Sequence, residues 1–194
     1  MLTEVLESRL NGLVSLNASQ MAALESHYEL LLRWNRSLNL TTVTSVEEAA
    51  ERHYCEALFL AAHLPPDSSR IVDIGSGAGF PGIPVAILRP DCQVFLIEAH
   101  QRKAVFLREA SRGMTNVKVL PRRAEDVDGE FDAAISRAVS YADLRGCLKK
   151  LARSADLLTG AEEPPETLGF HWKAGIRLPW GENRYLRCGV RTPE

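Results

Sequence analysis

The chain has 194 residues, of which 45% are hydrophobic and 25% charged, a composition typical of a soluble globular domain. Its formal net charge of −2 excludes a broadly basic nucleic-acid binder, so any nucleic-acid partner must be held by local patches. The N-terminus lacks a secretory signal, and no apolar run reaches the ~18 residues that span a membrane. We therefore expect a cytosolic location without membrane contact. The four cysteines are far apart in the sequence, which favours buried thiols over a metal site or disulfides.

The N-terminal part of the chain is predicted to be helical. Apolar residues recur every three or four positions over Ser19–Leu38, which predicts an amphipathic helix. A second helix is predicted over Ser45–Leu64 and ends at Pro65-Pro66, which cannot donate helical hydrogen bonds. The predicted capping boxes are Asn17 with Gln20 and Ser45 with Glu48. We expect residues 1–66 to form a helical extension packed on the domain that comes after it.

From Arg70 onward, strand patterns alternate with helix patterns. The predicted strands are Ile71–Ile74, Gln93–Glu98, Val117–Leu120, Phe131–Ser136 and Asp156–Thr159, and the helices are one starting near Pro84, His100–Met114 and Tyr141–Ala152. This alternation predicts an α/β domain, residues 67–194, with a doubly wound and mostly parallel, Rossmann-like sheet. His171–Leu178 and Arg184–Val190 resemble a terminal hairpin, which would add an antiparallel edge strand.

Three glycines, Gly75, Gly77 and Gly79, directly follow the first predicted strand. Glycines there allow backbone angles closed to other residues and let the main chain approach a ligand. Because the turn leads from a strand into a helix, it lies where doubly wound sheets open their ligand crevice. The glycine pattern alone is weak evidence, since a purely structural tight turn would look the same.

A carboxylate, Glu98, ends the second predicted strand, ~20 residues after the turn, where it can accept the ribose hydroxyls of a nucleoside. Phe80–Pro84 places bulk and two prolines where a dinucleotide pyrophosphate would need free amides. Asp73 adds a negative charge that would repel a pyrophosphate and suit the ammonium of a methionine group. These features favour S-adenosylmethionine over NAD.

Arg122–Asp126 comes after the third predicted strand. Its acidic pair, Glu125 and Asp126, can line an adenine while backbone amides contact the ring edge. A solvated charged turn is the alternative interpretation of the same residues.

The residues after the fourth predicted strand narrow the acceptor chemistry. Methylation at C5 of a pyrimidine needs a cysteine nucleophile, and methylation of an exocyclic amine is commonly served by an Asp/Asn-Pro-Pro-aromatic turn. Ser136–Val139 offers neither. Attack by a lone pair that needs no deprotonation, such as guanine N7, remains and depends chiefly on proximity and orientation.

Several segments together resemble the bacterial 16S ribosomal RNA guanine-N7 methyltransferases, also called the glucose-inhibited division protein B family. These segments are Trp34–Thr41, Arg52-His53, Asp73–Pro84, Arg102–Leu107, Arg123–Glu125 and Ile135–Ala138. The resemblance implies a class I methyltransferase fold, S-adenosylmethionine as methyl donor, and the 16S rRNA of the small ribosomal subunit as partner. It does not call for a metal or for more than a monomer.

The resemblance also assigns site residues. Arg137 stands where the family places a binding arginine, and we interpret it as a catalytic-site charge partner for the donor carboxylate or for an RNA phosphate. The predicted cofactor-binding set is Asp73, Gly75, Gly77, Gly79, Phe80, Glu98, Ala124, Glu125 and Arg137.

The sequence departs from the family pattern at two places, and other functions are therefore considered. The chain has Leu158-Thr159-Gly160 where relatives often have a Lys-Gly pair, and its tail is short with an acidic, proline-rich Glu162–Pro165. An NAD-dependent oxidoreductase and a non-catalytic module that binds rRNA or the ribosome are the alternatives. The basic clusters available for phosphates are Arg33 with Arg36, Arg122 with Arg123, and Arg145 with Lys149, Lys150 and Arg153.

Overall fold

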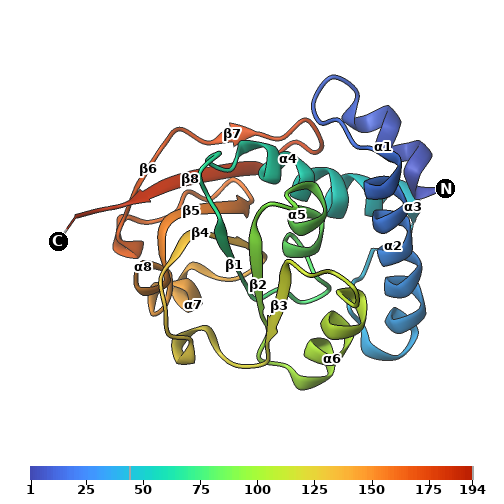
Figure 1. Ribbon diagram of the computed structural model, residues 1–194. Helices are drawn as coiled ribbons and strands as arrows, with labels where there is room; N and C mark the ends of the chain where they lie inside the picture. The colour runs from blue at the N-terminus through green and yellow to red at the C-terminus, as the bar shows by residue number, and fades with distance from the viewer. Residues whose placement is uncertain (44, 194) are drawn as a thin grey trace.

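The computed structural model describes residues 1–43 and 45–193, and its centre is an eight-stranded sheet (Figure 1). The strands are β1 Arg70–Ile74, β2 Gln93–Ile97, β3 Val117–Leu120, β4 Phe131–Arg137, β5 Ala152–Thr159, β6 Phe170–Trp172, β7 Ile176–Arg177 and β8 Tyr185–Arg191. Their order is β3-β2-β1-β4-β5-β8-β6, with β7 also paired to β8. The first five strands are parallel, and β8 is antiparallel to β5. The predicted doubly wound sheet with an antiparallel addition is confirmed.

The order in which successive strands are added to the sheet changes direction between β1 and β4. From β1 the chain moves outward to β2 and β3, then returns to the other side of β1 with β4 and β5. In open parallel sheets the crevice at the carboxyl ends of the strands on either side of such a reversal is the usual ligand site. The segments that leave β1 and β4 therefore mark the site.

The helices of the N-terminal part are α1 Leu2–Leu10, α2 Ala18–Leu38, α3 Val46–Ala49, the π-helical η1 Ala50–Cys55 and α4 Glu56–His63. Helix α2 begins with the predicted box, in which Asn17 and Gln20 exchange hydrogen bonds of 2.9 and 3.0 Å. The predicted second helix is α3, η1 and α4 in succession. The Ser45 hydroxyl accepts from the Glu48 amide, but the Glu48 carboxylate pairs with Arg52 at 2.7 Å instead of completing a box. Helix α1 was not predicted from the sequence.

The remaining helices cover both faces of the sheet. They are α5 Gly82–Leu88, α6 Gln101–Ala110, η2 Ala124–Asp126, α7 Tyr141–Arg145, α8 Leu148–Leu151 and η3 Glu166–Leu168. The predicted helix over Tyr141–Ala152 is two short helices, because Gly146-Cys147 interrupts it and Ala152 already begins β5. Figure 1 shows α7 and α8 well apart from the other helices.

Two hydrophobic clusters hold these layers together. The larger joins the N-terminal helices to one sheet face and includes Leu6, Leu31, Leu58 and Ile135. The smaller packs α7 and α8 under the opposite face, around Leu148. The N-terminal helices are thus part of the main core, which fits an extension packed on the domain. The boundary between residues 66 and 67 stays a prediction.

The C-terminal segment is more broken than predicted. Residues 171–178, predicted as one strand, form β6 and β7, and both pair with β8. Strand β8 lies inside the sheet, and β6 forms the edge beside it. The interruption includes Gly175, whose α-carbon lies against the Arg187 guanidinium so that a Cβ there would be 2.3 Å from Arg187 Nη1.

Three further properties concern the part of the chain that the structure describes. None of its helices is long and apolar enough to cross a membrane, and residues 1–43 and 45–193 contain no His, Cys, Asp and Glu group arranged for a metal. Cys55, Cys92 and Cys147 are buried free thiols, as predicted, and Cys188 is half-buried.

Candidate functional site

The glycine turn after β1 is held against the end of β2. The amides of Gly75 and Ser76 both donate to the carbonyl of Ile97, at 3.0 and 2.9 Å. Gly75, Gly77 and Gly79 have φ of 73°, 55° and 87°, in the left-handed region that favours glycine. The backbone alone therefore favours glycine at all three positions of the predicted turn.

The atoms that a side chain would meet at each glycine distinguish the positions enclosed by protein from the position open to a ligand. A Cβ on Gly75 would lie 2.6 Å from Val139 Cγ2, and one on Gly79 would lie 2.5 Å from Ile83 Cδ1. A Cβ on Gly77 would meet only the carbonyl oxygen of Gly75, at 3.9 Å. Gly77 therefore borders open space that a ligand can fill, whereas its neighbours are enclosed by protein.

Asp73, near the end of β1, anchors the turn. Its Oδ2 accepts the amide of Gly82 at 3.0 Å, and the side chain is fully buried. Burial raises the pKa of Asp73 to about 7 because the interior disfavours the charged form. The other carboxyl oxygen, Oδ1, is buried without a hydrogen-bond partner among the described residues. Asp73 therefore supports the turn, and its second oxygen is unpaired but closed off from solvent.

Glu98 lies directly after β2, across from the glycine turn. Its Oε2 accepts the amide of Gly77 at 2.9 Å, and its Oε1 accepts the amide of His100 at 2.7 Å. These bonds fix the orientation of the carboxylate, which is 9% exposed. A carboxylate oxygen has two lone pairs, so each oxygen keeps one for a ligand hydroxyl. This geometry fits the predicted contact with a ribose.

Phe80 and the Ala124-Glu125 pair complete the predicted cofactor set. Phe80 is buried in an aromatic cluster, with its ring centre 4.7 Å from that of His53 and 4.9 Å from that of Tyr54. Ala124 is buried and Glu125 exposed, both in η2 beyond the carboxyl end of β3. The predicted cofactor residues thus come after successive strands along one sheet edge.

Arg137 is the last residue of β4 and lies beside a cavity of about 810 Å³. The cavity is bounded by the Asn39–Val43 loop, by Arg52 and His53 of η1, by the segment Arg137–Ala142 and by Leu158–Glu162 after β5, together with Arg184. No residue of the glycine turn lines it, but Val139, which packs against Gly75, does, so the cavity adjoins the turn. Arg137 is the predicted site residue that borders it. Thr159, at the position of the absent family lysine, is in its wall.

The contribution of η1 to this site was not predicted from the sequence. Arg137 Nη1 is 2.8 Å from His53 Nδ1 and also donates to the carbonyl of Arg52. Next to them, Glu56, fully buried in α4, accepts two hydrogen bonds from Arg184 at 2.8 and 2.6 Å. The Arg52-His53 pair is part of the family resemblance, but no spacing in the chain indicates that it meets Arg137.

Comparison with known proteins then decides the family. The family model described as rRNA small subunit methyltransferase G (GidB) matches residues 20–158. The chain belongs to this family. A relative named ribosomal RNA small subunit methyltransferase G from Halorhodospira halophila is 40% identical over 139 residues, which are 70% of this chain and 66% of the relative. A relative of the same name from Dichelobacter nodosus is 46% identical over 119 residues, covering 59% and 56%.

The relatives are longer than the matched region, because the first three matches cover 54 to 66% of their lengths. Family members thus extend beyond what this chain matches, and the C-terminal part after residue 158 lies outside the family match.

Solved structures confirm the predicted fold class. The magnesium protoporphyrin IX methyltransferase of Synechocystis superposes with a TM-score of 0.62 over 86% of this chain and 95% of its own, at 13% identity. A SAM-dependent methyltransferase from Aquifex aeolicus gives a TM-score of 0.58 over 75% and 93%, at 17% identity. At such identities the likeness concerns the class I methyltransferase fold alone.

Proposed function

We propose that this protein transfers the methyl group of S-adenosylmethionine to N7 of a guanine in 16S ribosomal RNA. The observation that carries the proposal is the juxtaposition, in a member of this family, of an open glycine turn, an oriented Glu98 and an Arg137 beside a cavity. The cofactor, when bound, supplies an electrophilic methyl group on a sulfonium. The protein has to bind it, orient the acceptor and exclude competing groups.

The cofactor-facing residues divide by chemistry. Gly77 leaves open space beside the main chain, and the Glu98 carboxylate suits the ribose hydroxyls. Ala124 and Glu125 would border the adenine. The unpaired oxygen of Asp73 suits an ammonium group. Gly75, Gly79 and Phe80 would support the turn from behind, because their immediate neighbours are protein atoms.

The acceptor step needs no general base and no covalent nucleophile. Guanine N7 has an exposed lone pair, so catalysis comes from holding it in line with the methyl group. Burial raises the pKa of the Cys55 and Cys188 thiols to about 12 and that of Cys147 to about 11. These thiols are therefore protonated at neutral pH and unsuited to the cysteine chemistry of pyrimidine C5 methylation.

The cavity beside Arg137 is our proposed place for the acceptor nucleotide. N7 lies on the major-groove edge of guanine, which the deep major groove of an RNA helix hides. The target guanine is therefore expected in a loop or flipped from its stack. Arg137 at the cavity supplies donors for a nucleotide phosphate, whereas Arg52 and Arg184, which also border the cavity, are already paired with Glu48 and Glu56.

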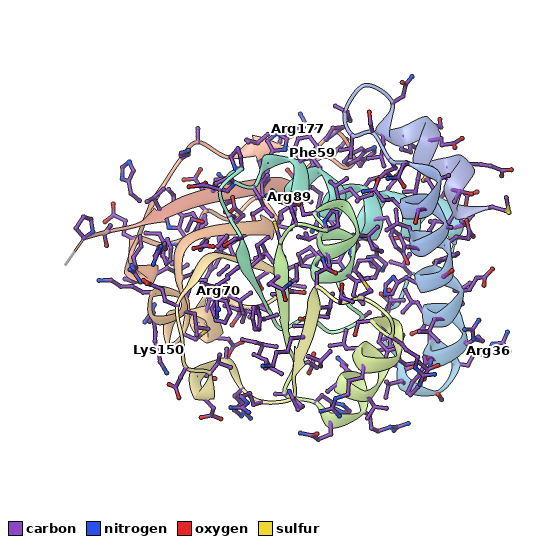
Figure 2. All side chains as sticks on the ribbon, in the orientation of Figure 1. Arg36, Phe59, Arg70, Arg89, Lys150 and Arg177 are labelled. Carbon is purple, nitrogen blue, oxygen red and sulfur yellow. The ribbon has the colours of Figure 1, made fainter. Side chains whose placement is uncertain are left out.

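The surface cations favour one side of the molecule for RNA. Lys150 pairs with Asp128 and Arg153 pairs with Glu130, so two cations of the cluster around α8 are neutralised, while Arg145 and Lys149 are in no ion pair with a described residue. Among the described residues, no acidic partner lies within ion-pair distance of Arg33, Arg36, Arg122 or Arg123. Figure 2 shows Arg36 and Lys150 on opposite sides of the molecule. We propose that the side carrying α2 contacts the rRNA backbone, as a cytoplasmic monomer.

A thermal-shift experiment tests the cofactor part of the proposal against the oxidoreductase alternative. A ligand that binds the folded state raises the melting temperature, so S-adenosylhomocysteine should stabilise the protein and NAD should not. Stabilisation by NAD alone would contradict the proposal. Stabilisation by S-adenosylhomocysteine with no methyl transfer to free 16S rRNA or to small subunits would favour the non-catalytic RNA-binding module.

A further inference from the structure

One edge of the Arg137 guanidinium is held by the N-terminal helices. Its Nη1 lies 2.8 Å from Nδ1 of His53 and donates to the carbonyl of Arg52. Its Cζ lies 5.3 Å from the centre of the Phe80 ring. Neither Nη2 nor Nε forms a hydrogen bond with a residue that the structure describes. The contacts with His53 and Arg52 therefore use only Nη1 of Arg137. Its Nη2 and Nε keep their donors for a ligand at the cavity that Arg137 borders.

His53 is itself held in a single orientation. Its Nε2 lies 2.8 Å from Oγ1 of Thr41, which also accepts the amide of Val43 at 3.0 Å. Its ring stacks on Phe80 with centres 4.7 Å apart and planes at 28°, and only 6% of the residue is exposed. Hydrogen bonds at both nitrogens and a stacked face leave the ring little freedom to rotate.

The partners of His53 also fix its tautomer. A guanidinium has only donors, so Nδ1 of His53 has to accept and carry no proton. Nε2 then carries the proton and donates to Thr41 Oγ1. Burial, together with the charge of Arg137, lowers the pKa of His53 to about 3. The ring is therefore neutral at physiological pH, as an acceptor has to be.

We infer that His53 is a positioning residue for methyl transfer: through Nδ1 it orients the Arg137 guanidinium so that Nη2 and Nε face the cavity. The inference rests on the proposed role of Arg137 in binding the donor carboxylate or an RNA phosphate. The π-helical segment that carries His53 fits this role, because such segments are rare and often lie at functional sites. The N-terminal extension is then part of the active site.

Two substitutions separate the Nδ1 contact from the rest of the side chain. In His53→Asn the amide oxygen takes the place of Nδ1 and can still accept from Arg137. In His53→Gln the terminal amide reaches the place of Nε2, so the contact with Thr41 is kept and the acceptor for Arg137 is lost. We expect kcat/KM for rRNA methylation to fall ~10-fold or more in His53→Gln and to stay within ~3-fold of the parent in His53→Asn.

The matched control is His63→Asn. His63 is an exposed histidine of α4 whose Nδ1 contacts the carbonyl of Phe59 in its own helix. Its substitution should change neither kcat/KM nor the melting temperature. Equal losses in His53→Asn and His53→Gln would overturn the inference, because they would show that packing rather than the acceptor matters. Unchanged kcat/KM in His53→Gln would overturn it as well.

A double-mutant comparison tests whether His53 acts through Arg137. In an Arg137→Ala background, His53→Gln should reduce kcat/KM no further, because there is no guanidinium left to orient. An undiminished loss would overturn the inference while leaving the role of Arg137 intact. If Arg137→Ala alone leaves methylation unchanged, the proposed role of Arg137 fails first and the inference fails with it.

A measurement without substrate or cofactor completes the test. Long-range ¹H–¹⁵N spectra of the ligand-free protein should show His53 as the Nε2–H tautomer, without titration from about pH 5 to about pH 9. Arg137→Ala should move the Nδ1 resonance of His53 far more than any resonance of His63. An Nδ1–H tautomer, or a titration near the usual histidine pKa, would overturn the inference even if His53→Gln is inactive.

Discussion

The two halves of the carboxyl edge of the sheet are built in different ways. The half after β1, β2 and β3 consists of short local features, each at a strand end: a glycine turn, Glu98, and the Ala124-Glu125 pair. The half after β4 and β5 surrounds the cavity, and its walls come from the loop after α2, from η1 and from the C-terminal segment. The first half resembles many nucleoside-binding folds. The second depends on the N-terminal helices that pack against it.

We infer from this difference that the two halves carry different functions. A cofactor common to many methyltransferases is expected at the half that many methyltransferases share. The acceptor is expected at the half whose walls include the N-terminal helices. Substitutions on the first side should therefore weaken cofactor affinity, whereas substitutions on the second should slow transfer with less effect on affinity for the free cofactor.

The largest effect should come from the cavity side. Arg137→Ala removes the guanidinium whose Nη2 and Nε have no hydrogen-bond partner among described residues, and we expect kcat/KM to fall ~100-fold or more. Arg137→Lys should recover only part of the rate, because an ammonium lacks the planar fork of donors. Single-turnover methylation of small subunits measures the rate, and circular dichroism checks the fold. An unchanged rate would place Arg137 outside the reaction.

The glycine turn gives the next largest effect. In Gly77→Ala the new methyl group points into open space, so cofactor affinity should fall ~10-fold while the melting temperature changes little beyond the ~1 kcal/mol cost of a positive φ. Gly75→Ala should instead destabilise the protein strongly, because its Cβ meets Val139. Calorimetric titration with S-adenosylhomocysteine and thermal unfolding measure the two effects. Undiminished affinity in Gly77→Ala would show that the open space does not face the cofactor.

Glu98→Gln tests the oriented carboxylate at the end of β2. The amide keeps an oxygen for only one of the two backbone amides, Gly77 and His100, that Glu98 now accepts. We expect affinity for S-adenosylhomocysteine to fall about 10-fold, since charge-assisted hydrogen bonds to the ribose are lost. The same variant should bind methionine analogues that lack the ribose as weakly as the parent. Equal affinity of variant and parent for S-adenosylhomocysteine would contradict a ribose contact.

A separate prediction concerns stability, pH and Asp73. The pKa of Asp73 is raised by burial from 3.8 to about 7, so the folded state holds this proton more tightly than the unfolded state. Its contribution to stability is complete below about pH 4 and is lost as pH rises through about 7. Asp73→Asn should therefore gain melting temperature relative to the parent between these values and hold the gain above them.

Cofactor affinity should show the opposite trend at the same residue. A cationic ligand group favours the ionised carboxylate, so the parent should bind S-adenosylhomocysteine more tightly as pH rises through about 7, and Asp73→Asn should lose this dependence. Titrations at several pH values measure it. If the affinity of the parent does not change with pH across this range, the proposed contact between Asp73 and the ligand ammonium is wrong.

How far the sequence can predict this molecule depends on the range of the interactions involved. The strands β1 to β4 and the Asn17–Gln20 box are local patterns, and their predicted bounds agree with the structure to within a residue or two. The break between α7 and α8 is not predictable in this way, because the apolar pattern continues through Gly146-Cys147. The break within residues 171–178 is equally hidden, because the contact of Gly175 with Arg187 depends on tertiary pairing.

The candidate site shows the same division. Glu98 is predictable from its distance to the glycines, because strand lengths and crossover helices fix where the next strand ends. The contact between His53 and Arg137 is not, since it depends on how the extension packs on the sheet. The sequence also does not predict that Gly75 is enclosed and Gly77 open, because the residue that encloses Gly75 is Val139, in the turn after β4.

The most direct test of the central claim is transfer of a tritiated methyl group from S-adenosylmethionine to naked 16S rRNA and to small subunits that lack the modification. The modified base is then located by reduction and aniline cleavage, which act at N7-methylguanosine. We predict RNA-bound label at a single guanine N7, lost in Arg137→Ala and kept in His63→Asn. Label on protein, on a small molecule or on another atom of the RNA would contradict the proposed function.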